Sequence, residues 1–109
     1  MKYKLMMSPL AHDDIDKIHK YIAENDLVNA NNVVNRIYDV IKKIEIFPKI
    51  GSSVKERFEA ESNYLYFAVS PFSYLILYII EDETIFIDRI IDGRRDCMRV
   101  LTAKIGELE

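Results

Sequence analysis

Residues 64–92, YLYFAVSPFSYLILYIIEDETIFIDRIID, contain the pattern that decides the fold of this 109-residue chain. Tyr, Phe, Ile, Leu and Val dominate three runs of strand length, which are 64–69, 74–80 and 85–91. The segments between these runs, SPFS at 70–73 and EDE at 81–83, are short enough to join antiparallel neighbours. The stretch therefore predicts three consecutive antiparallel strands.

The middle run of this stretch has no polar face. Successive side chains of a strand point to opposite faces of a sheet. One set is Tyr74, Ile76, Tyr78 and Ile80, and the other is Leu75, Leu77 and Ile79. A pair of helices covers only one face of a sheet. We therefore expect the C-terminal segment, loops or a partner to cover the other face.

Helical spacing dominates the chain before this stretch. Ser8 and Pro9 are the residue types preferred at a helix N-cap and first turn, and they open a predicted helix of roughly 17 residues. Its apolar stripe is Ala11, Ile15, Ile18 and Ile22. A second stripe is Ala30, Val33, Val34, Ile37, Ile41 and Ile44. Its helix begins at Asn25 or Asp26 and ends before Pro48. Together they predict an antiparallel helical hairpin.

The remaining segments complete an α+β order. Residues 2–7 alternate as a short strand does, and residues 48–63 are irregular, with room for one helical turn. The predicted architecture is an N-terminal strand, a helical hairpin and a mainly antiparallel sheet, in the order β-α-α-β-β-β. We expect one domain over residues 1–101 and a tail over 102–109, whose final Leu-Glu pair is typical of a cloning scar.

Composition narrows the possible partners and the compartment. The chain carries 15 Lys and Arg against 18 Asp and Glu, a net charge of −3. An acidic chain is unsuited to non-specific nucleic-acid binding, which depends on excess positive charge. The sequence contains no apolar run of membrane-spanning length. It contains a single cysteine, which cannot form an internal disulfide. We expect a cytoplasmic protein without a membrane partner.

Few side chains have the pattern of a metal or nucleophile site. His12, Asp16 and His19 share one side of the first helix. No ligand from another element can be named to complete a metal site with them, so we interpret them as solvated charge. Cys97 has no histidine nearby in sequence and is interpreted as a small packing residue. We expect neither a metal nor another cofactor.

Two segments are locally basic. Residues 42–57 carry five cations against two acids, and residues 88–104 carry five against three. If the fold brings these segments together, they form an anion-facing patch. The alternative is ordinary surface charge that pairs with its neighbours.

Three pieces of the sequence resemble the RelE/ParE superfamily, the toxins of bacterial type II toxin–antitoxin pairs. They are YKLMMSPLAHDDIDKIHKYI at 3–22, Phe47-Pro48 followed by Gly51, and YLILY at 74–78 followed by IDRIIDGRRD at 87–96. Their order and spacing extend the resemblance from residue 1 to about 101. It implies a toxin of plasmid stabilisation or growth control, and a hetero-oligomer with a cognate antitoxin.

The superfamily has two main activities, and the resemblance leaves both open. One branch cleaves mRNA on the ribosome, and the other inhibits DNA gyrase. For the nuclease branch, the matching catalytic residues are Arg57, Arg94 and Arg95. The matching phosphate or RNA contacts are Lys49, Lys55 and Arg89.

The gyrase branch is favoured because two nuclease positions differ. Asp92 stands where many relatives have His, and Leu101 stands where a nuclease Tyr would fall. Arginine stabilises charge but is a poor base. A gyrase inhibitor needs only a binding surface, and position alone suggests Arg94, Arg95, Arg99 and Leu101 for it. A third alternative is a degenerate member that binds its antitoxin without toxicity.

Overall fold

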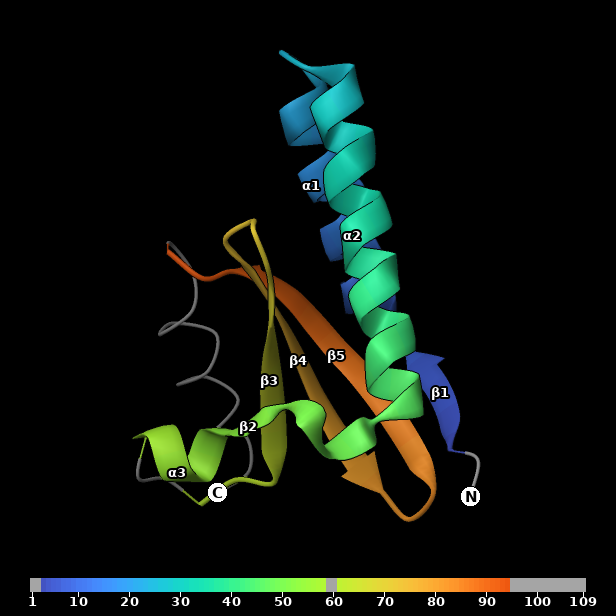
Figure 1. Cartoon of the computed structure of the whole chain (residues 1–109), viewed down its shortest axis with the longest axis vertical. Helices are drawn as coiled ribbons and strands as arrows, with labels where there is room; N and C mark the ends of the chain where they lie inside the picture. Colours follow the sequence, from blue (N-terminus) through green and yellow to red (C-terminus); the bar gives the residue numbers. More distant parts are fainter. Residues whose placement is uncertain (1–2, 59–60, 95–109) are drawn as a thin grey trace.

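A computed structural model describes residues 3–58 and 61–94. The elements are β1 (Lys4–Met7), α1 (Pro9–Ala23), α2 (Leu27–Ile46), η1 (Pro48–Ile50), β2 (Ser52–Ser53), α3 (Val54–Phe58), β3 (Tyr64–Val69), β4 (Tyr74–Glu81) and β5 (Thr84–Asp92). The predicted α+β order is confirmed. The structure adds η1, β2 and the short α3 between the hairpin and β3 (Figure 1).

Both long helices begin at the caps that the sequence indicates. The Ser8 hydroxyl accepts a hydrogen bond from the Ala11 N–H at 3.0 Å, and the Asp26 carboxylate accepts one from the Asn29 N–H at 3.0 Å. Each cap satisfies a donor that the helix itself leaves unpaired. Pro48 follows the C-cap of α2 at Phe47 and turns the chain into η1.

The sheet has the strand order β1-β5-β4-β3-β2. The strands β3, β4 and β5 form the predicted antiparallel meander, whereas β1 pairs parallel with β5, from Lys4 opposite Thr84 to Met7 opposite Ile87. The β4–β5 pairing shifts register between Leu77 and Tyr78. One extra residue of β5 is accommodated there, as in a β-bulge.

The helical hairpin covers one face of the sheet. Ile15, Ile37 and Ile44 of the helices and Ile76, Tyr78 and Ile87 of the strands are at most 4% exposed in one continuous core. On the opposite face, Val54 of α3 packs with Leu77 and Ile91, and all three are buried. This face was expected to be covered by the C-terminal segment, by loops or by a partner. Among the described residues, the segment between α2 and β3 covers it, through α3.

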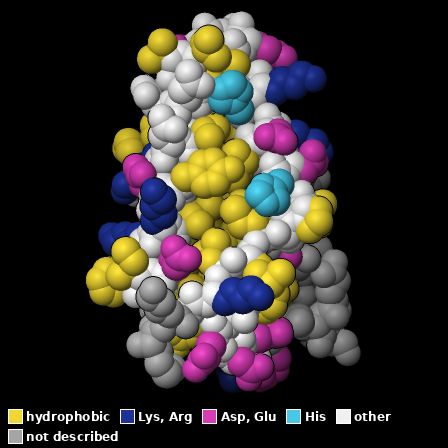
Figure 2. Space-filling view, turned by 90° about the vertical axis from the view of Figure 1, so that its right-hand side faces the viewer, with side chains coloured by type: hydrophobic (Ala, Val, Ile, Leu, Met, Phe, Trp, Pro, Cys, Tyr) yellow, Lys and Arg dark blue, Asp and Glu magenta, His cyan; other side chains and the backbone are white. Residues whose placement is uncertain are grey.

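The hairpin extends beyond the sheet at the end where α1 turns into α2 (Figure 1). Tyr21, Leu27 and Val28 near this turn are 66%, 58% and 70% exposed. Figure 2, turned toward the side of α2 and β1, shows a band of hydrophobic side chains bordered by histidine and charged side chains. In the part of the chain that the structure describes, no helix is both long and apolar enough to cross a membrane.

Candidate functional site

The side chain of Tyr78 anchors the segment from η1 to α3. The Tyr78 hydroxyl donates a hydrogen bond to the Pro48 carbonyl at 2.7 Å and accepts one from the Gly51 N–H at 2.9 Å. Tyr78 is fully buried, and this burial raises the pKa of its phenol. A Cβ added at Gly51 would lie 2.5 Å from the Tyr78 hydroxyl. Only glycine lets the backbone approach this closely.

The anchored segment presents three of the predicted cations. Lys49 of η1 and Lys55 and Arg57 of α3 are all exposed. The Lys55 ammonium lies 3.7 Å from the Glu61 carboxylate, a weak surface pair. The basic character expected of residues 42–57 is thus present on one segment at the β2 edge of the sheet.

An open hollow of about 460 Å³ lies beside α3, and Arg57 lines it together with Glu56 and Tyr66. A carboxylate and a guanidinium that face the same space could accept a proton and hold a phosphate. In the sequence, Glu56 is only one of two acids among the five cations of residues 42–57. Its place beside Arg57 and Tyr66 depends on β3, and no local pattern indicates it.

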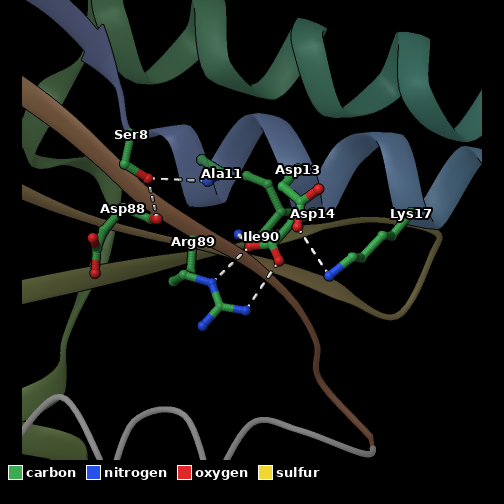
Figure 3. A network of polar contacts seen from close by, with 8 residues as sticks. All are labelled: Ser8, Ala11, Asp13, Asp14, Lys17, Asp88, Arg89 and Ile90. Carbon is green, nitrogen blue, oxygen red and sulfur yellow. Dashed lines mark hydrogen bonds and ion pairs between the residues drawn. The ribbon is translucent and has the colours of Figure 1, made fainter.

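The half-buried side chain of Arg89 is bound by the Asp14 carboxylate (Figure 3). Its Nε and Nη2 donate to the two oxygens of the Asp14 carboxylate at 2.8 and 3.0 Å, and the Ile90 N–H donates to the same carboxylate at 2.9 Å. The side chains of Arg89 and Asp14 are only 25% and 11% exposed. The Arg89 guanidinium, a predicted phosphate contact, is therefore already paired with a carboxylate of the protein.

Arg94 lies at the other end of the sheet from α3. Its N–H donates to the Asp92 carboxylate at 2.8 Å, and the neighbouring Gly93 N–H donates to the Ser73 carbonyl. Ser73 follows the far end of β3, whereas α3 precedes its start (Figure 1). Among the described residues, the two basic segments therefore do not combine into one patch.

Arg95, Arg99 and Leu101, which were predicted for catalysis or partner binding, and Cys97 lie outside the described residues. The histidines of α1 can be placed: His19 Nε2 lies 2.8 Å from the Asn31 amide oxygen, and His12 and Asp16 are exposed. No cluster of three metal-binding side chains forms in residues 3–58 and 61–94.

A second hollow, of about 390 Å³, lies between α2 and β3 and is called here the α2–β3 groove. Arg36 and Lys43 of α2 line one side, and Phe67, Ala68 and Ser70 line the other. The Arg36 Nε donates to the Ser70 carbonyl at 2.7 Å, and the Lys43 ammonium lies 5.5 Å from the centre of the Phe67 ring. No local pattern of the sequence indicates Arg36, because only the tertiary structure brings α2 to this strand.

The structure of the chromosomal ParDE TA system from P. aeruginosa is similar, with a TM-score of 0.70 and 16% sequence identity, over 84% of this chain and 96% of that chain. Residues 5–97 match the family described as ParE toxin of type II toxin-antitoxin system, parDE, and the chain belongs to this family. No curated relative matches the sequence.

Proposed function

We propose that this toxin inhibits DNA gyrase by binding it in the bacterial cytoplasm, and that a cognate antitoxin neutralises it in a toxin–antitoxin hetero-oligomer. The observation that carries the proposal is the match to ParE toxins over residues 5–97. Two placements support it: Arg89 is committed to Asp14, and Asp92 binds the backbone of Arg94. Inhibition by binding requires a surface and no catalytic set.

A supercoiling assay tests the proposal directly. Purified toxin, freed of antitoxin, is titrated into gyrase, ATP and relaxed plasmid. We expect a dose-dependent loss of supercoiled product, with relaxation by topoisomerase I unchanged. Undiminished supercoiling at high molar excess would exclude gyrase as the target.

The proposed target surface can be tested in the same assay. Arg94 is exposed at the end of β5, and Arg94→Glu is expected to raise the concentration needed for half-inhibition about tenfold if this cation contacts gyrase. Lys20→Glu, an equal charge change on an exposed residue of α1, serves as the control. Equal inhibition by both variants would place the contact elsewhere.

A second candidate activity is ribosome-dependent cleavage of mRNA, because Glu56, Arg57 and Tyr66 line one hollow. Here the Glu56 carboxylate would take the 2′-hydroxyl proton, and the 2′-oxygen would attack the phosphate held by Arg57. The bond to the 5′-oxygen would break, and that oxygen would take a proton from water, with Lys49 and Lys55 as outer contacts. Induction without antitoxin separates the activities. Early loss of thymidine incorporation indicates gyrase, whereas early loss of methionine incorporation, abolished by Arg57→Ala in a folded variant, indicates the nuclease. Harmless expression would indicate a degenerate member.

A further inference from the structure

The helical hairpin exposes a side chain of α1 that points in the same direction as a residue bound to the sheet. Tyr21 follows Asp14 by seven residues, which is about two turns of α1, so both lie along one line of the helix. Asp14 contacts β5 at Arg89 and Ile90, whereas Tyr21 is 66% exposed. The Tyr21 ring therefore adds little apolar burial to the folded state.

Two further apolar side chains are exposed on the other side of the helix junction. Leu27 and Val28, the first residues of α2, are 58% and 70% exposed. All three apolar residues lie within about one helical turn of the junction, and Figure 2 shows hydrophobic side chains at this end of the molecule. Single exposed apolar residues are ordinary on a protein surface, but three that gather at one projecting end mark an interaction site.

The polar residues around this end are asparagines and acids. Residues 21–35 contain five Asn, two acids and no Lys or Arg. Asn25, Asn29 and Asn32 are exposed. Tyrosine together with adaptable carboxamides is the composition of protein-binding loops. A surface without cations repels a nucleic-acid backbone, so the charge favours a protein as its ligand.

Two contacts fix the shape of this end of the hairpin. His19 Nε2 and the Asn31 amide oxygen, 2.8 Å apart, join α1 to α2, and the Asp26 carboxylate caps α2. Ala30 and Val33 of α2 are buried. A partner therefore contacts side chains on formed helices, and little ordering of the backbone is needed on binding.

The apolar part of the surface is too small to bind a partner alone. Its three side chains expose on the order of 300 Å², whereas a stable interface buries about 800 Å² of each partner. A second copy of the chain would gain too little from this contact. The end of β5, which Arg94 follows, points toward the same end of the molecule (Figure 1). A larger protein reaches both places in one wide contact.

We propose that the hairpin tip is the surface by which this toxin binds its target protein. The hairpin tip consists of Tyr21, Asn25, Leu27, Val28, Asn29 and Asn32. The apolar side chains enter a hollow of the target, and the carboxamides bond to polar groups around it. On the function proposed above, the target is the protein part of gyrase and not its DNA. The inference rests on that function only for the identity of the target.

Two variants test the hairpin tip without changing the core. Tyr21→Ala removes the exposed ring, and Leu27→Glu places an acid in the first turn of α2, where the helix dipole favours it. In the supercoiling assay we expect each variant to raise the concentration for half-inhibition at least about tenfold, with an unchanged melting temperature. The same variants should relieve the growth arrest that induction without antitoxin causes.

Lys20→Glu and Phe47→Ala are the matched controls. Lys20 precedes Tyr21 but shares the line of Asp13, seven residues earlier, and Phe47 is a 60% exposed aromatic residue at the opposite end of α2. Both controls are expected to inhibit as the parent chain does. Binding of the parent chain to immobilised gyrase subunits without DNA should change less than about threefold between about 50 and 200 mM salt, because no phosphate is contacted.

The outcomes separate the hairpin tip from the identity of the target. Tip variants that inhibit gyrase and arrest growth as the parent does would overturn the inference. So would binding that requires DNA or falls steeply with salt, or a dimer of the parent chain that Tyr21→Ala dissociates. Relief of growth arrest by the tip variants, with supercoiling unaffected by the parent chain, would contradict gyrase alone and support the hairpin tip. A harmless parent chain would contradict both proposals.

Discussion

The Asp14 carboxylate bonds to the edge of β5 at Ile90, beyond the residues of β5 that pair with β1. The strand β1 ends at Met7, opposite Ile87, so the outer edge of β5 beyond that point faces α1. There the Asp14 carboxylate accepts hydrogen bonds from the Ile90 N–H and from Nε and Nη2 of Arg89. A single side chain thus satisfies a backbone donor and a guanidinium that the protein has largely removed from water.

Removing this carboxylate should be costly. In Asp14→Ala the half-buried guanidinium and the Ile90 N–H lose their shared acceptor, and we expect the free energy of unfolding to fall by about 2–3 kcal/mol. Urea denaturation measures the change. Asp13→Ala is the control, because Asp13 pairs with the exposed Lys17 and should have little effect. Equal losses in the two variants would contradict the role given to Asp14.

The titration of Tyr78 makes the stability of the folded state depend on pH in the alkaline range. Because its pKa lies above the ordinary 10.0, the folded state keeps the phenolic proton at pH values where the unfolded chain has lost it. Its contribution to stability is therefore fully present below pH 10 and decreases as the pH rises further. For Tyr78→Phe, which loses the bonds to Pro48 and Gly51, we expect a deficit of about 1–2 kcal/mol at pH 7.

The pH dependence of this deficit is the measurement that checks the sign. Urea unfolding of both proteins between pH 7 and 11 should show curves that approach each other above pH 10. The limiting slope for one group is about 1.4 kcal/mol per pH unit. Parallel curves over the whole range would show that Tyr78 titrates alike in both states.

At the scale of the elements, Ser8 joins α1 to the sheet. Its hydroxyl accepts from the Ala11 N–H and donates to the Asp88 carbonyl at 2.6 Å, beyond the last residue of β5 paired with β1 (Figure 3). One side chain therefore caps the helix and bonds to the strand beside it. The helix entry and the β5 edge are stabilised together.

The two helix caps should differ in their contribution. We expect Ser8→Ala to lower the free energy of unfolding by about 2 kcal/mol and Asp26→Ala by about 1 kcal/mol, because Asp26 caps only the exposed start of α2. Thermal unfolding of the two variants against the parent chain checks the order. A larger loss for Asp26→Ala would contradict it.

The sequence predicts the long elements and not the short ones. Both helices and the three strands of the meander follow from apolar periodicity, turn residues and caps such as Ser8 and Asp26. By contrast, β2 has two residues and α3 five, too few for any period. Likewise, the pairing of β1 with β5 is parallel and distant in sequence, so no local pattern indicates it.

At the scale of the whole molecule, the hairpin should be less stable toward its tip. The helices continue past the sheet (Figure 1). Tyr21, Leu27 and Val28, near the turn between the helices, are exposed. We expect amide hydrogen exchange at residues 18–34 to be about tenfold faster or more than at 37–44, which lie over the sheet. Uniform protection along both helices would contradict this gradient.

The candidate site was only partly predictable for a related reason. Lys49, Lys55 and Arg57 are close in sequence and therefore lie on one segment. Whether Arg89 and Arg94 join them depends on the direction of the strands and on the contact with Asp14. Both are features of the tertiary structure. The α2–β3 groove depends in the same way on where β2 stops.

The bond between Ser8 and Asp88 links residues 80 positions apart, and the β1–β5 ladder lies beside it. During translation, β1 therefore emerges first and has no partner until β5 has been made. Contacts of this sequence separation require the closure of a long loop, which slows folding. A nascent copy of this toxin cannot complete its sheet until most of the chain has left the ribosome.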